Sequence, residues 1–488
     1  MLDEVLAATE DAGTRLTEGV AGGCSATAAV AMPKGETMET MISTWRRTLP
    51  VLLTAALVAG AGPALAQTPK ELPRAASPSE VGISADRIER LAQVLRADAA
   101  AGAIPGAVVL VSRYGRIAYE AAVGFRDRTA NAPMQPDAIF RLASMTKPIT
   151  TLAAMVLVEE GRLHLHEPVA RWLPELKELN VGVEKIDPNG KLVLTLEPAQ
   201  RPVTVQDLMR HTSGFTYGQF GNSLVHQEYM KAKAMDPQQT NAEMVTKLSR
   251  LPLRYQPGTT FEYSMSTDVL GRLIEVISDM DLERFIADRI TRPLDMRDTT
   301  FVLDPAKAGR VAELDVDKAT GQRPPASSPA NPPKWFSGGG GLYSTARDYA
   351  RFAQMLLNGG ELDGVRLVSA KTVRFMASNH LPPGVGYGGT VGLLSVIAPT
   401  PANGQGFGLG FAVRLEEGRH PNPGSVGDFY WAGAFGTYFW IDPREKLFAL
   451  FMTQLPGASP QRVIYRSLMR NLVYQSLAEL APPPGRNP

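Results

Sequence analysis

Cysteine is almost absent from this chain. The one cysteine among 488 residues, Cys24, lies close to the amino terminus. A disulfide framework is therefore excluded, and a chain of this length can bury a sufficient core without one. Cysteine nucleophiles and cysteine-ligated metals are excluded for the same reason. With only six histidines, we predict a surface turn at His164 and His166 and no metal site.

Excess charge is also absent. The 50 basic and 49 acidic side chains give a formal net charge of +1, with no basic run or acidic tail. This balance excludes nucleic acid as a partner chosen by bulk electrostatics, so a small neutral ligand is expected. The glycine run 338–341 is not followed by G-K-[ST], which predicts a tight turn into a helix near Ser344 rather than a phosphate loop. No cofactor is predicted, and nothing in the sequence specifies an oligomeric state.

No apolar run in the chain has the length of about 20 residues that spans a bilayer. The run at 49–61 follows a pair of arginines and precedes A-L-A, which ends at Ala66. This order is typical of a secretory signal peptide. We therefore predict a leader over 1–66, with the signal peptide at about 41–66 and cleavage after Ala66. The protein is expected to be periplasmic or secreted, without a stable membrane anchor.

The remaining chain begins and ends with β-rich segments. After a linker over 67–83, Ser84 can cap a helix that carries Ile88, Leu91 and Leu95 on one face. Two β-rich runs follow and are predicted to form a hairpin through Tyr114 and Gly115. Further strands are expected late in the chain, before a final helix with an apolar face at residues 464, 468 and 472.

Between these β-rich ends the pattern is helical, with long loops that contain proline and glycine. This order predicts an α+β fold with one antiparallel sheet built from both ends of the chain. The sheet domain would be discontinuous, formed by 84–145 and 336–488, and a mostly helical domain over 146–335 would be inserted into it.

The segment RLASMTKPIT lies at the start of the insertion and contains an S-x-x-K pattern. Three residues are about one helical turn, so Ser144 and Lys147 would lie on the same face and could touch. The pattern also arises by chance, and Ser144 could simply be a helix N-cap. A lysine is, however, a poor choice for a helix amino terminus, which already presents positive charge. A nucleophile between two domains would lie in a cleft.

Five blocks of sequence carry a family resemblance. They are FRLASMTK, LMRHTSGF, PGTTFEYSMSTDVLG, GGGGLYSTARDYARF and FYWAGAFGTYFWIDP. In this order the chain resembles, over roughly residues 80–480, the serine β-lactamase and penicillin-binding-protein superfamily, most closely the family VIII carboxylesterases. The resemblance implies a β-lactamase-like fold: an antiparallel sheet flanked by amino- and carboxy-terminal helices, an inserted all-helical domain, and an active site in the cleft between them.

The resemblance also implies the catalytic residues. Ser144 would form an acyl-enzyme, and Lys147 with Tyr263 would act as a coupled base and proton shuttle. The backbone amides of Ser144 and Ala434 would form the oxyanion hole. His211, in the block LMRHTSGF, is predicted to have a structural role.

The substrate-binding residues implied by the resemblance are Trp431, Gly433 and Met265. Trp431 stands where lactam-cleaving enzymes usually keep a lysine, and Met265 stands where an asparagine is expected. Gly433 could instead be a strand glycine at a bulge. The replacements at Trp431 and Met265 favour a secreted carboxylesterase that acts on small esters. The alternatives are a β-lactamase or D-alanyl-D-alanine peptidase on the same scaffold, and a non-catalytic penicillin-binding sensor.

Overall fold

The computed structural model describes residues 70–457 and 459–480. The predicted signal peptide and the cleavage site after Ala66 lie outside the described residues. The described residues belong to one compact unit, and the division into a sheet domain and an inserted domain stays a prediction. Within the described ranges, no helix combines the length and the apolar character needed to cross a membrane.

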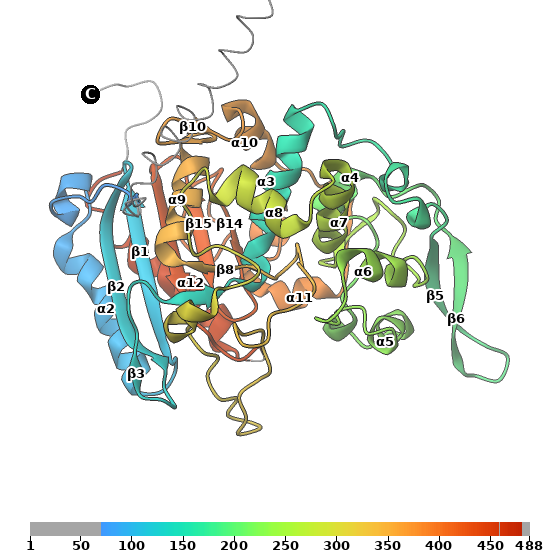
Figure 1. The fold of residues 1–488 in the computed structure, drawn as a ribbon, viewed down its shortest axis with the longest axis horizontal. Helices are drawn as coiled ribbons and strands as arrows, with labels where there is room; N and C mark the ends of the chain where they lie inside the picture. Colours follow the sequence, from blue (N-terminus) through green and yellow to red (C-terminus); the bar gives the residue numbers. More distant parts are fainter. Residues whose placement is uncertain (1–69, 458, 481–488) are drawn as a thin grey trace, which may run out of the picture. The chain divides into compact units, whose positions relative to one another are not determined.

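The core of the unit is an eight-stranded antiparallel sheet of order β12-β13-β14-β15-β16-β1-β2-β3 (Figure 1). Its strands are β1 Gly106–Arg113, β2 Arg116–Asp127, β3 Ala132–Pro133, β12 Gln405–Phe407, β13 Ala412–Arg414, β14 Phe429–Ala432, β15 Tyr438–Asp442 and β16 Leu447–Met452. The amino-terminal β1 pairs with the carboxy-terminal β16, with Leu110 opposite Leu450. This pairing confirms that both ends of the chain build one sheet.

The β1–β2 hairpin turns at the predicted position. Tyr114 and Gly115 both have positive φ, 54° and 76°, as a two-residue turn that matches strand twist requires. Every residue of β1 and of β16 is buried, because helices cover both faces of the sheet. In Figure 1 the strands β1 and β2 lie between α2 and α9.

The helices divide between the sheet and the segment inserted into it. Their bounds are α2 Ala85–Ala100, α3 Thr146–Glu159, α4 Val205–Met209, α5 Leu224–Lys231, α6 Asn241–Leu248, α7 Ser266–Ser278, α8 Leu282–Ile286, α9 Ala346–Leu357, α10 Ala370–Met376, α11 Thr390–Leu394 and α12 Gln461–Tyr474. The side chain of Ser84 caps α2 by accepting a hydrogen bond from Arg87 N, and the predicted apolar face of α2 is buried.

The buried face of α12 agrees with the predicted one only in part. Ile464 is 56% exposed, whereas Tyr465, Met469 and Val473 are buried. Arg470 is buried on the same side, because its guanidinium pairs with Asp428 at 2.8 Å. Leu468 and Leu472 pack against the core as predicted, so only Ile464 departs from the expected face.

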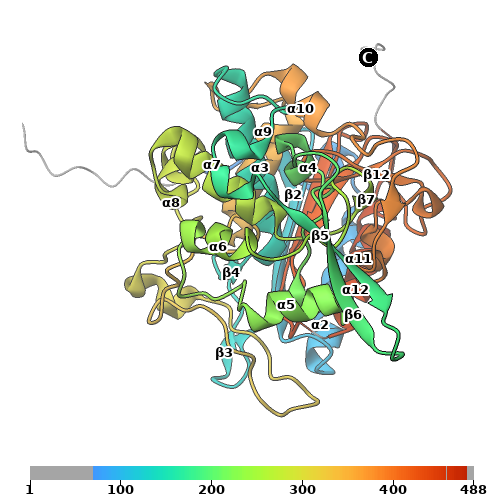
Figure 2. The same ribbon diagram turned by 90° about the vertical axis from the view of Figure 1, so that its right-hand side faces the viewer.

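The inserted segment leaves the sheet region and returns to it at one place. Two short strands, β4 (Ile139–Arg141) and β8 (Tyr343–Thr345), pair side by side in antiparallel register. The segment between them is not all helical, which corrects the expectation. It contains a hairpin of β5 (Asn180–Ile186) and β6 (Leu192–Pro198), which extends to one side in Figures 1 and 2.

The sequence does carry a signal for this hairpin, although we did not predict it. The two strands read NVGVEKI and LVLTLEP, and they flank the turn residues D-P-N-G. Alternating β-branched and apolar residues around such a turn are typical of a hairpin. A short β7 (Thr260–Phe261) in the same segment pairs with β11 (Gly386–Tyr387).

The buried carboxylate of Asp348, at the start of α9, makes stability depend on pH. Its Oδ2 accepts hydrogen bonds from Asp298 N (2.7 Å) and from Thr299 Oγ1 (3.0 Å). Burial nevertheless raises the pKa of Asp348 to about 6. A raised carboxyl pKa stabilises the fold below the unfolded-state pKa of about 3.9, and this stabilisation is lost as pH rises through 6.

We therefore expect Asp348→Asn to raise the free energy of unfolding at pH 8 relative to wild type. The gain, which Asn provides by avoiding a buried charge, should be up to about 3 kcal/mol, and it should disappear near pH 4. Urea unfolding of both proteins from pH 4 to pH 8 measures this difference. Asp86→Asn, at an exposed position of α2, is the control. Parallel pH curves for wild type and Asp348→Asn would contradict the prediction.

Candidate active site

Ser144 and Lys147 lie in contact, as the S-x-x-K spacing predicts. Ser144 belongs to a 3-10 turn over Ala143–Met145, which leads directly into α3. Lys147 Nζ donates a hydrogen bond to Ser144 Oγ at 3.3 Å. Ser144 is not the N-cap of α3, because Met145 occupies that position. Ala143, just before the serine, has a φ of 46°, a conformation that costs energy in a non-glycine residue and is frequent at functional sites.

The ammonium of Lys147 is almost completely buried. The residue is 1% exposed, and Nζ also donates to the Gly339 carbonyl at 2.7 Å and to Tyr217 OH at 3.1 Å. An ammonium has three protons, so these two bonds and the bond to Ser144 use all of them.

The glycine run 338–341 supplies one of these acceptors. It forms a tight turn, in which Gly340 N and Gly341 N both donate to the Ser337 carbonyl, as predicted. A Cβ atom at Gly339 would collide with the carboxylate of Asp268. Glycine here allows the backbone to approach a buried side chain closely.

Two further residues, Tyr217 and Asp268, join this network, and neither was predicted from the sequence. Tyr217 OH donates to Asp268 Oδ2 at 3.4 Å. Asp268 Oδ1 accepts from Ser337 Oγ at 2.5 Å and from Gly339 N at 3.0 Å. Both residues lie within the five sequence blocks or just beyond them, but no spacing marks them, because α7 and the loop after α4 meet only in the folded chain.

Burial sets the protonation of this pair. It raises the pKa of Tyr217 well above 10, and the charge of Asp268 adds to that effect. Burial also raises the pKa of Asp268, although Lys147 and the hydrogen bonds oppose the shift. Tyr217 therefore keeps its proton at neutral pH and bridges Lys147 to Asp268.

Tyr263 meets Lys147 through its ring. Nζ of Lys147 lies 4.6 Å from the ring centroid, and the Tyr263 hydroxyl accepts a hydrogen bond from Trp431 Nε1 at 3.3 Å. His211 also packs against Tyr263, with ring centroids 4.8 Å apart. Burial, and then the charge of Lys147, lower the pKa of His211 well below 6.5, so this imidazole is neutral and supports the tyrosine ring.

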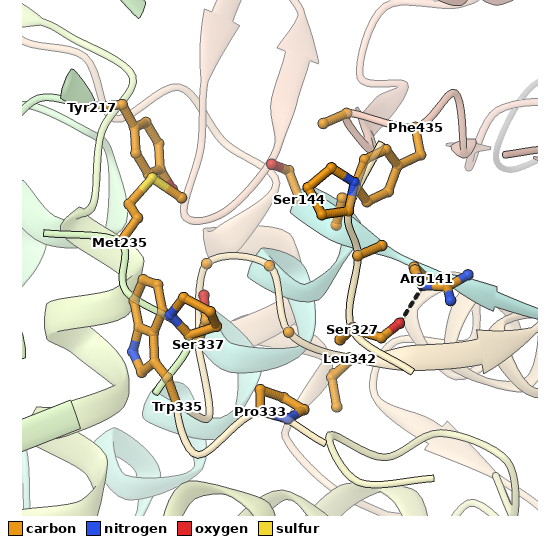
Figure 3. Close-up of a pocket in the computed structure, with 18 of the residues that line it drawn as sticks. Arg141, Ser144, Tyr217, Met235, Ser327, Pro333, Trp335, Ser337, Leu342 and Phe435 are labelled. Carbon is orange, nitrogen blue, oxygen red and sulfur yellow. Dashed lines mark hydrogen bonds between the residues drawn. The ribbon is translucent and has the colours of Figure 1, made fainter. Parts of the chain in front are cut away.

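A cavity of about 600 Å³ opens above Ser144. Ala434 lines it together with Phe435, and Figure 3 shows Phe435 beside the serine. Within the described part of the chain, the Ala434 N–H donates to no backbone carbonyl. This amide is therefore available to a ligand, as the predicted oxyanion role requires.

The three predicted substrate-binding residues do not line this cavity. Trp431 is 1% exposed and packs against Tyr263 and Phe407. Met265 is completely buried at the start of α7. Trp431 and Met265 were assigned from their places in motifs, but their side chains point into the protein core.

Gly433 serves a contact within the protein. A Cβ atom there would collide with the Leu142 carbonyl and with Thr437 Oγ1. Thr437 Oγ1 itself donates to the Leu142 carbonyl at 3.0 Å. Gly433 thus lets β14 approach the backbone that precedes Ser144, and its contact with a ligand stays a prediction.

Trp431→Phe tests whether the indole N–H positions Tyr263. Phenylalanine keeps most of the packing but removes the hydrogen bond to the Tyr263 hydroxyl. We expect kcat on an aryl ester to fall about tenfold with KM changed less, because a misplaced group affects the transition state most. Steady-state kinetics measure the changes in kcat and in KM separately. Trp172→Phe, outside the cavity lining, is the control, and an unchanged kcat for Trp431→Phe would count against the positioning role.

Asp268→Asn tests the buried charge beside Lys147. Removing the carboxylate favours the neutral lysine, so the acidic limb of the kcat/KM profile should move to lower pH. Tyr217→Phe should move the limb in the same direction by a smaller amount, since it removes only the bridge. Profiles of the two variants between pH 4 and pH 10 check this, and a limb that stays in place in both would show that Asp268 does not influence the titrating group.

Comparison with known proteins shows the family to which this chain belongs. A family model described as Beta-lactamase matches residues 91–472. The uncharacterised protein MT1414 of Mycobacterium tuberculosis is 37% identical over 360 residues, which cover 72% of this chain and 86% of that protein. Esterase EstB of Burkholderia gladioli is 30% identical over 367 residues, which cover 71% and 85% of the two chains.

A solved structure shows the same architecture. Unliganded simvastatin synthase (LovD) from Aspergillus terreus matches with a TM-score of 0.66 at 26% identity, covering 81% of this chain and 100% of that one. The resemblance inferred from sequence is thereby confirmed. The chain belongs to the beta-lactamase family, as a serine hydrolase of the β-lactamase fold with an esterase among its relatives.

Proposed function

We propose that this protein is a carboxylesterase that works through an acyl-enzyme on Ser144. The observation that carries the proposal is the contact between Ser144 Oγ and Lys147 Nζ at the floor of the cavity. Ser144 Oγ attacks the ester carbonyl and its proton passes to Lys147. The amides of Ser144 and Ala434 stabilise the oxyanion, the C–O bond to the alcohol breaks, and the alcohol leaves with the proton. Water then cleaves the acyl-enzyme.

Lys147 can accept a proton only when its amine is neutral. The hydrogen-bonded path from Lys147 through Tyr217 ends at the buried carboxyl group of Asp268. Its charge opposes the neutral amine, and the Asp268→Asn variant described above measures this effect. Tyr263 lies against the same ammonium, and we retain it as part of the proton-transfer unit.

The charges at the cavity support an uncharged ester over a lactam. Among the described residues that line the cavity, Arg141 is the only one with a formal charge. Its guanidinium donates to the carbonyls of Ser327 and Ala312 and to Glu313 Oε2, so the lining offers no free cation to a lactam carboxylate. Burying a carboxylate without a partner is costly. The hydrolase would act after export, as the leader sequence predicts.

Labelling with an aryl phosphonate tests the nucleophile. The adduct should form on Ser144, and peptide mass analysis should find it there. Ser144→Ala should abolish both labelling and ester turnover, whereas Ser327→Ala, at another serine of the cavity lining, should still be labelled. Labelling of Ser144→Ala at the wild-type rate would overturn the assignment.

A side-by-side assay tests the reaction class. We expect kcat/KM for 4-nitrophenyl butyrate to exceed that for a cephalosporin by at least about 100-fold, a difference of about 2.7 kcal/mol. Because one structural neighbour is named a synthase, the assay includes an alcohol acceptor to measure how the acyl-enzyme partitions. Equal rates on the two substrates would place the β-lactamase alternative first.

A further inference from the structure

The cavity above Ser144 is much larger than a short ester needs. Its volume is about 600 Å³, and a water molecule in the liquid takes about 30 Å³, so the space equals about 20 water-sized groups. An acetyl group has three non-hydrogen atoms and would leave most of the cavity unfilled. The volume is in the range of pockets that bind drug-sized molecules, about 300–1,000 Å³.

The wall that faces Ser144 is apolar. Figure 3 shows Met235 and Trp335 across the cavity from Ser144 and Phe435. The indole N–H of Trp335 already donates to Asn241 Oδ1 at 2.9 Å, so Trp335 can offer a ligand only carbon surface. Met235 is 41% exposed, and its unbranched thioether side chain can adapt to ligands of different shape.

This wall is formed before any ligand binds. The backbone amides of Lys334 and Trp335 both donate to the Pro237 carbonyl, at 3.0 Å and 3.2 Å. The segment of Trp335 is thereby fixed to the segment of Met235, although about 100 residues of chain separate them. A preformed apolar wall lowers the entropic cost of binding an apolar group.

We propose that the substrate of Ser144 carries a bulky, uncharged, apolar group that binds against Met235 and Trp335. This inference rests on the proposed esterase function and departs from the small ester expected from sequence. The group would contain roughly ten or more non-hydrogen atoms, from the volume left beside the ester. It could belong to the acid or to the alcohol of the ester, since the wall recognises only apolar surface.

Two series of esters distinguish these sources. The acid series compares 4-nitrophenyl acetate with 4-nitrophenyl octanoate, and the alcohol series compares ethyl acetate with 2-naphthylmethyl acetate. In at least one series, wild type should prefer the bulky member by at least about tenfold in kcat/KM, which corresponds to about 1.4 kcal/mol. Met235→Glu should reduce that preference by at least about tenfold, because the carboxylate would contact the apolar group.

Met230→Glu is the matched control, since Met230 is exposed and lies outside the lining of this cavity. It should leave the preference intact. Trp335→Ala, compared with the conservative Trp335→Phe, gives a second measurement that does not depend on Met235. If wild type hydrolyses neither series, the esterase proposal itself fails. If esters are hydrolysed without a preference for bulk, or if neither Met235→Glu nor Trp335→Ala lowers the preference, the apolar subsite is wrong while the esterase stands.

Discussion

The burial of the Lys147 ammonium is the constraint on which the rest of the site depends. A buried charge costs several kcal/mol unless it is paired and fully hydrogen-bonded. The protein meets this requirement with Ser144, the Gly339 carbonyl and Tyr217, and with the carboxylate of Asp268 one hydrogen bond further on. Placing Lys147 in the core beside Ser144 thus accounts for the glycine turn at 338–341, for Tyr217 and for the buried Asp268.

The fold supplies these partners from distant parts of the chain. Because β4 and β8 pair, the turn with Ser144 and the glycine turn before β8 lie next to each other, although the whole inserted segment separates them in sequence. The β14–β15 turn reaches the same point through Gly433, whose missing side chain leaves room for the Leu142 carbonyl. Ser144 and Ala434, the two residues proposed as oxyanion donors, therefore come to line one cavity through backbone contacts that involve no ligand.

This arrangement explains which parts of the site could be predicted. The contact of Ser144 with Lys147 follows from helical spacing alone, and the sheet from both ends follows from the order of the strands. The roles of Trp431 and Met265 could not be derived in this way, because a motif position does not tell whether a side chain faces a cavity or the core. Tyr217 could not be found at all, since its partner Asp268 is on another element and their contact exists only after folding. The β5–β6 hairpin, in contrast, was predictable from its turn residues and was missed.

The site separates charge from apolar surface, and in the proposed reaction this separation would have opposite effects on acylation and on hydrolysis of the acyl-enzyme. Lys147 contacts Ser144 but does not line the cavity, while Met235 and Trp335 line it across from Ser144. On the proposed mechanism, an apolar group that fills the cavity would displace water, the oxyanion donors would act more strongly in the drier site, and acylation would become faster. The same group, while it remained attached to Ser144, would keep out the water that must cleave the proposed acyl-enzyme. A bulky acid would thus accelerate the first step and slow the second, whereas a bulky alcohol would leave after the first step and reopen the cavity to water. Which half of the ester contacts the apolar wall therefore decides which step limits turnover.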